Sequence, residues 1–188
     1  MLQKREKMYH IKPDKRSGKS AKLVCEGLAD MLNEKSYCDI TISDVCSRCG
    51  IARTTFYRLF DTLDDVMLYQ FDSLFEESIA EYAENQNPHK SLAKTLLEIA
   101  ANNKPLISAI VASGRSDLFS ASAASKEKWI HQTIHLQISE KDSVYCTAML
   151  TQLAYAVLSI WVNTGCHESS DALYEIMKRN IKLIDSHL

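Results

Sequence analysis

The sequence has few of the residues that interrupt regular structure. Its 188 residues include only five glycines and three prolines. Proteins built from many short strands need many tight turns, and glycine and proline supply a large share of the residues at those turns. The shortage of both argues against a turn-rich β protein and favours an all-α fold.

Long apolar runs are also missing. The chain begins with a charged stretch, Met1 to Lys7, which lacks the apolar core of a signal peptide. No segment approaches the roughly 18 consecutive apolar residues that a transmembrane helix needs. We therefore expect a cytoplasmic protein with no membrane contact, whose six cysteines remain thiols.

Charge is distributed unevenly along the chain. Residues 1–60 contain 12 Lys and Arg against 7 Asp and Glu, whereas residues 61–188 contain 10 against 17, so +5 is followed by −7. A basic N-terminal part on an acidic body is typical of a protein that presents one end to a polyanion. A solvated charged tail is the alternative that charge alone leaves open.

Hydrophobic periodicity predicts nine helices and no strand. Residues 1–16 show no periodicity and contain Pro13, so they are expected to form a flexible basic arm. The helices are expected at about 20–35, 42–49, 53–60, 62–84, 89–102, 104–113, 117–138, 142–164 and 170–186.

The strongest local signals lie between Thr41 and Phe60. Thr41 to Asp44 has the T-x-x-D pattern of a capping box, and Gly50 stands where a left-handed residue ends a helix. In the helix that follows, Phe56 and Phe60 share one face and are expected in the core. Two short helices around a glycine turn are a helix-turn-helix arrangement, whose second helix can enter the major groove of DNA.

The segment from Ile40 to Phe60, ITISDVCSRCGIARTTFYRLF, resembles the DNA-binding domain of TetR-type (tetracycline-repressor-like) transcriptional regulators. The resemblance covers about residues 20–66, and the chain length and helical remainder also fit that family. It implies a nine-helix, two-domain protein with a helix-turn-helix domain over 17–62 and a ligand-sensing and dimerisation domain over 63–188. It also implies a homodimeric repressor that binds a palindromic double-stranded operator and responds to an unknown small-molecule effector.

The resemblance also implies which side chains contact DNA. Thr41 and Tyr57 are expected at backbone phosphates, and Thr41 also has a structural role as a helix cap. The full set of candidate DNA-binding residues is Lys19, Thr41, Arg53, Thr54, Thr55, Tyr57 and Arg58.

Several positions depart from the family pattern. Ala52 replaces a common capping serine, Leu59 replaces a polar residue that often contacts DNA, and Leu63 replaces a lysine that usually meets phosphate. Because Leu63 cannot bind a phosphate, the basic arm is expected to do so in its place. The alternative function is a protein-binding coregulator with the same fold, which acts through a partner regulator.

Aromatic and methionine residues in the remainder suggest an apolar ligand pocket, with packed core as the alternative. The segment from Tyr145 to Val162, with the closing helix at 170–186, is expected to supply a four-helix dimer seam. The candidate pocket residues are Phe71, Phe75, Trp129, Met149 and Tyr155.

Two further patterns have a chemical and a structural interpretation. Cys46 and Cys49 have C-x-x-C spacing but no second pair, so we expect small core residues, with a thiol sensor as the alternative. His131 and His135 lie one turn apart but lack the glutamate of a zinc protease. No nucleophile elbow, dinucleotide-binding turn or carboxylate pair is present, so we expect no enzyme activity, no metal and no cofactor.

Overall fold

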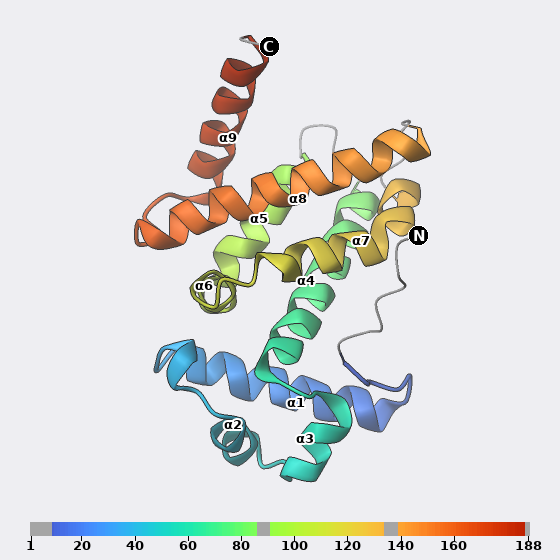
Figure 1. Cartoon of the computed structure of the whole chain (residues 1–188), viewed down its shortest axis with the longest axis vertical. Helices are drawn as coiled ribbons and strands as arrows, with labels where there is room; N and C mark the ends of the chain where they lie inside the picture. Colours follow the sequence, from blue (N-terminus) through green and yellow to red (C-terminus); the bar gives the residue numbers. More distant parts are fainter. Residues whose placement is uncertain (1–8, 86–90, 134–138, 187–188) are drawn as a thin grey trace. The chain divides into compact units, whose positions relative to one another are not determined.

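The structure is a computed structural model that describes residues 9–85, 91–133 and 139–186. Over these residues the chain forms nine α-helices, one short 3-10 helix and no strand, which confirms the all-α prediction (Figure 1). The chain divides into two compact units, Met1–Asp72 and Ser73–Leu188.

The first unit contains three helices and the beginning of a fourth. Helix α1 packs against α2 and α3, and α2 packs against α3. A 3-10 turn, η1, occupies the break predicted after the first helix. The bounds are α1 (Lys15–Leu32), η1 (Tyr37–Asp39), α2 (Ile42–Cys49), α3 (Arg53–Leu59) and α4 (Leu63–Asn85), which continues past the division at Asp72.

Helix α2 begins and ends as its sequence predicts. The Thr41 side chain accepts a hydrogen bond from the backbone N–H of Asp44, and the Asp44 carboxylate accepts one from the backbone N–H of Thr41. Gly50 ends the helix with φ of 66°, in the left-handed region that suits glycine. The predicted capping box and glycine turn are both confirmed.

Thr62 to Asp65 also has the T-x-x-D pattern, which predicts a second capping box, and the structure contains it. Asp65 donates its backbone N–H to the Thr62 hydroxyl at 3.2 Å, and the Asp65 carboxylate accepts from the N–H of Thr62 at 2.8 Å. This pair fixes the start of α4 directly after α3.

The core of the first unit lies where the three helices meet. Val24 and Leu28 of α1, Val45 of α2 and Phe56 of α3 are fully buried, and so is Phe60 just after α3. Burying one such side chain stabilises the fold by about 1.5–3 kcal/mol. The prediction that Phe56 and Phe60 belong to the core is confirmed.

The described part of the N-terminal arm makes contacts that the sequence does not predict. Helix α1 begins at Lys15, with Asp14 as its N-cap. The Tyr9 hydroxyl donates to the Asp72 carboxylate at 2.9 Å, and the Tyr9 ring packs edge-on against Tyr69. His10 donates its backbone N–H to the carbonyl of Leu59 at 2.8 Å. Tyr9 and His10 therefore connect the arm to the first half of α4 and to the last residue of α3.

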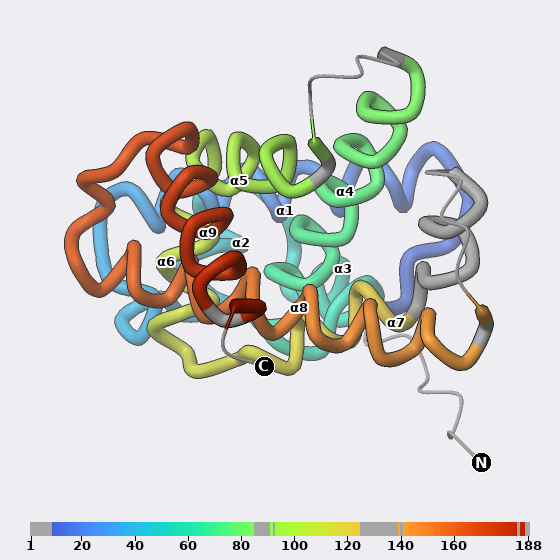
Figure 2. Tube along the Cα trace, turned by 90° about the horizontal axis from the view of Figure 1, so that it is seen from above, coloured from blue at the N-terminus to red at the C-terminus, as the bar shows by residue number. Residues whose placement is uncertain are grey.

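The second unit contains the remainder of α4 and, among its described residues, five further helices. Helix α8 packs along α7 and against α6, while α9 packs against α5 (Figure 2). Trp161 of α8 is 1% exposed and donates its indole N–H to the carbonyl of Glu168. The bounds are α5 (Leu92–Asn102), α6 (Lys104–Ala112), α7 (Ser116–Thr133), α8 (Glu140–Asn163) and α9 (Ser170–Asp185).

Where residues are described, the predicted helix boundaries in this unit hold within a few residues. The helix predicted at 117–138 corresponds to α7, which is described from Ser116 to Thr133, and residues 134–138 lie outside the described residues. The helix predicted from residue 89 begins at Leu92.

The surface of helix α8 is more apolar than we expect from the sequence, because the sequence has no long uninterrupted apolar run. Among the helices in the described part of the chain, its segment Lys141–Asn163 alone is long and apolar enough to cross a membrane, with a mean hydropathy of 1.4. Only 17% of that window is buried. A single such helix is weak evidence for a membrane span, since helices of soluble proteins meet the same criterion.

Candidate nucleic-acid interface

Helix α3 separates polar from apolar side chains along its length. Phe56 and Leu59 are at most 1% exposed and hold the helix against α1 and α2. The opposite side carries residues predicted to contact DNA, which are exposed. These are Arg53, Thr54, Tyr57 and Arg58.

Arg53 and Tyr57 form a pair on the exposed side of α3. They lie four residues apart, which places them on the same face of a helix. The Arg53 guanidinium donates to the Tyr57 hydroxyl at 3.4 Å and lies 6.0 Å from the centre of its ring. The hydrogen bond with Tyr57 raises the pKa of Arg53 above its ordinary value, because it stabilises the charged guanidinium. Tyr57 is 45% exposed, so a ligand can reach both groups.

The other three predicted contact residues have different surroundings. Thr41 is exposed at the start of α2, where its hydroxyl oxygen accepts the capping bond from Asp44. A hydroxyl that accepts one bond still has a proton to donate to an anion. Lys19 is exposed on α1, and Thr55 is half-buried on α3.

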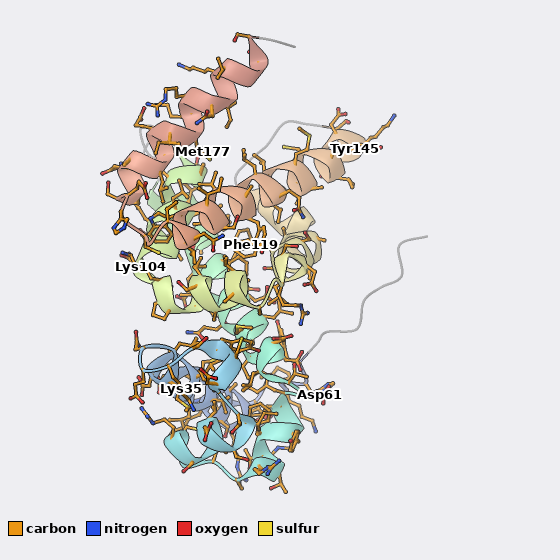
Figure 3. All side chains as sticks on the ribbon, turned by 60° about the vertical axis from the view of Figure 1, so that its left-hand side comes forward. Lys35, Asp61, Lys104, Phe119, Tyr145 and Met177 are labelled. Carbon is orange, nitrogen blue, oxygen red and sulfur yellow. The ribbon has the colours of Figure 1, made fainter. Side chains whose placement is uncertain are left out.

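Two ion pairs connect α2 to the end of α1. Arg48 binds both carboxylate oxygens of Glu34, at 2.7 and 2.6 Å. Lys35, labelled in Figure 3, contacts the Asp44 carboxylate at 3.0 Å. These partners lower the pKa of Glu34 and of Asp44 below their ordinary values, because each cation stabilises the ionised carboxylate.

Leu59 and Leu63 stand where the resemblance leads one to expect polar contacts with DNA. Leu59 is 1% exposed and Leu63 is 9% exposed. Their side chains therefore pack inside the first unit and are withdrawn from the surface.

Basic residues of the arm lie beside α3, a position that local sequence patterns do not predict. His10, Lys12 and Arg16 line a surface hollow together with Arg58 of α3. The excess of basic residues in the first 22 positions is visible in the sequence. Their position is not, because it depends on the contacts of Tyr9 and His10 with residues far along the chain.

No model of a known protein family matches this chain, and no curated protein matches it. The TetR-type resemblance therefore stays a prediction that rests on the residues from Ile40 to Phe60. The function has to be argued from the side chains described above.

The candidate ligand-pocket residues belong to α4, α7 and α8. Met149 is 71% exposed and lines an open hollow on the surface of α8, and its role in binding a ligand stays a prediction. Tyr155 packs edge-on against Phe119, which is labelled in Figure 3, at 5.5 Å between ring centres. Phe71 belongs to the first unit, Phe75 is half-buried in the second, and the Trp129 side chain lies outside the described residues.

Of the C-x-x-C pair, Cys46 is buried in the core and Cys49 is half-buried. Cys46 is 5% exposed, and burial raises the pKa values of the Cys46 and Cys49 thiols. In the part of the chain that the structure describes, no group of three or more His, Cys, Asp or Glu side chains is placed to hold a metal ion. The side chains of His131 and His135 are outside that part.

Proposed function

We propose that the protein is a DNA-binding transcriptional regulator in which α2, the turn at Gly50 and α3 form a helix-turn-helix. The observation that supports this most is the surface of α3. One side is anchored by Phe56 and Leu59, and the other presents a cluster of exposed polar side chains to solvent. A helix held in this way can enter a major groove without unfolding its own core.

The exposed side chains have the chemistry that DNA recognition uses. An arginine can donate two hydrogen bonds to the O6 and N7 atoms of guanine, and threonine contacts bases or phosphates. Arg53 and Thr54 supply these groups, while the Tyr57 hydroxyl and the Thr41 hydroxyl are suited to backbone phosphates. Lys19 and Arg58 add positive charge, which supplies affinity that does not depend on sequence.

A regulator of this kind reads a palindrome as a dimer, and the second unit offers a surface for dimerisation. Tyr145, Met149, Ala156 and Ile160 of α8 recur at steps of four or seven residues and are all exposed. This spacing places them on one face of the helix. Ile181 and Leu183 of α9 are exposed too. Isolated monomers rarely leave so many large apolar side chains in water, so we propose a homodimer that covers them.

We propose further that the protein is a repressor released by a small molecule bound in the second unit. The support is α4, which runs without a break across the division at Asp72 and contributes residues to both units. Release requires an effector that binds one arrangement more tightly than the other by a few kcal/mol. A cytoplasmic location follows from this function.

Fluorescence anisotropy with a labelled DNA duplex and the purified protein alone tests the proposal. Affinity is expected to fall steeply, by about 10³-fold if six phosphates are contacted, as salt rises from about 50 to 200 mM. Equal affinity at both salt concentrations would contradict contacts to phosphate. The variant Arg53→Ala removes one proposed contact at an exposed site and is expected to weaken DNA binding.

The second candidate function is a coregulator that binds another regulator in place of DNA. The burial of Leu59 and Leu63 favours it, since both stand where the resemblance implies polar contacts with DNA. A coregulator leaves the duplex unbound when it is the only protein present. In an electrophoretic mobility shift experiment, a coregulator slows the duplex only after its partner regulator is added.

A further inference from the structure

A hollow of about 190 Å³ lies between the N-terminal segment and the end of α3. Its walls come from three parts of the first unit: the segment before α1, the first turn of α1, and α3. The lining residues are His10, Lys12, Asp14, Arg16, Ser17 and Arg58.

The walls of the hollow are held in place by specific contacts. The backbone N–H of His10 donates to the carbonyl of Leu59 at 2.8 Å, and its imidazole lies 3.1 Å from the Asp61 carboxylate. Asp61 follows α3 directly and is labelled in Figure 3. On the other side, Asp14 caps α1 by accepting hydrogen bonds from both the N–H and the hydroxyl of Ser17, each at 2.8 Å. The hollow is therefore built by the fold and does not depend on a ligand for its shape.

The hollow carries excess positive charge. Within the described residues, the side chains of Lys12, Arg16 and Arg58 have no hydrogen bond or ion pair, although all three line the hollow at the surface. The carboxylate in the lining belongs to Asp14, and both of its oxygens are already bound by Ser17. Three cations that make no hydrogen bond or ion pair with any residue that the structure describes, against one carboxylate that Ser17 already binds, make a site for an anion.

We infer that this hollow binds a backbone phosphate of duplex DNA beside the surface of α3. The inference rests on the proposed function and adds Lys12 and Arg16 to the DNA-binding residues. Arg58 belongs to α3 itself, so an anion in the hollow lies next to the helix that we place in the groove. This phosphate contact compensates for Leu63, whose buried apolar side chain cannot make one.

Neutralising the arm residues tests the inference. The variant Lys12→Gln/Arg16→Gln keeps two polar side chains but removes both charges. Its matched control is Arg179→Gln/Lys182→Gln, which removes two exposed charges from α9. We expect the arm variant to lower the salt slope of DNA binding by about 1 and the affinity by about tenfold at about 100 mM salt, with the control unchanged. Circular dichroism confirms that both variants fold.

Removing the negative charge from the hollow gives an independent test. Asp14→Asn removes the carboxylate from the hollow, while asparagine still caps α1 as well as aspartate does. DNA affinity is expected to rise at least about threefold and the salt slope to steepen. Asp39→Asn makes the same change in net charge at an exposed site outside the hollow and is expected to have a smaller effect.

The outcomes separate the inference from the proposed function. If Arg53→Ala abolishes binding but Lys12→Gln/Arg16→Gln matches its control, the inference is wrong and the function stands. If the wild-type protein binds no duplex, both are wrong. Inorganic phosphate titrated into the protein at constant ionic strength distinguishes DNA from a free anion. Saturable binding at micromolar phosphate, abolished in the arm variant, would overturn the assignment to DNA.

Discussion

Gly27 of α1 lies so close to Cys49 of α2 that a Cβ atom on the glycine would come within 3.1 Å of the Cβ atom of Cys49. The same atom would lie 3.5 Å from the carbonyl oxygen of Val45. This close approach sets the distance between α1 and the helix that precedes the Gly50 turn. It therefore determines where α3 is held.

Two glycine variants in α1 are expected to change stability in opposite directions. Gly27→Ala crowds Cys49 and is expected to lower the free energy of unfolding by about 1–2 kcal/mol. Gly18→Ala is expected to raise it by about 0.5–1 kcal/mol, because no atom lies within 4 Å of the added Cβ and alanine favours the helix. Urea unfolding measures both. A gain in stability from Gly27→Ala equal to that from Gly18→Ala would contradict the close packing.

The two carboxylates that fasten α2 predict how stability depends on pH. The pKa values of Glu34 and Asp44 are lowered in the folded protein, by Arg48 and by Lys35. A lowered folded pKa contributes stability above the unfolded pKa, near 4, and that stability disappears as pH falls through the folded pKa. Glu34→Gln/Asp44→Asn is therefore expected to flatten the decline in Tm between about pH 5 and 2. Asp39→Asn, at an exposed site, serves as control. An equal flattening of the Tm decline in that variant would contradict the role of the two ion-paired carboxylates.

The exposed face of α8 predicts a variant that dissociates the dimer. Met149→Glu places a charge in the middle of the apolar stripe, and the dimer dissociation constant is expected to rise at least about 30-fold. Ala124→Glu places the same charge at an exposed position of α7 and is expected to leave the dimer intact. Sedimentation velocity across a concentration series measures both. A wild-type protein that stays monomeric at high concentration would contradict the proposed dimer.

Burial predicts the order in which the cysteines react. Cys38 is exposed, whereas burial raises the pKa of Cys25 to about 12 and also raises that of Cys46. Because the thiolate is the reactive form, alkylation at about pH 8 is expected to label Cys38 first and Cys25 last. Mass spectrometry of the labelled peptides shows the order. Rapid labelling of Cys46 in the folded protein would instead favour the thiol-sensor alternative.

Features set by neighbouring residues could be predicted from the sequence. The capping boxes at Thr41 and Thr62 and the turn at Gly50 each depend on a few consecutive residues, and the structure has all three. The buried position of Phe56 follows from helical periodicity in the same way. Local chemistry is enough to fix such elements.

Features set by distant contacts could not be predicted in this way. The arm is attached through Tyr9 and Asp72, which are 63 residues apart, and no local pattern reveals such a pair. Helix α1 begins at Lys15, earlier than the sequence pattern predicts. Its N-cap Asp14 is followed three residues later by Ser17, and a full capping box would have a glutamate at that position. Met149 has the composition of a pocket residue, but its exposure depends on how α8 packs against α7.

Selection of duplexes from a random-sequence pool by the purified protein shows whether α3 reads DNA. We expect enrichment of a palindrome whose two half-sites are centred about one helical turn or a small multiple apart, and no such enrichment with Arg53→Ala. Recovery of no preferred sequence by a folded, dimeric protein would contradict the proposal that α3 reads DNA.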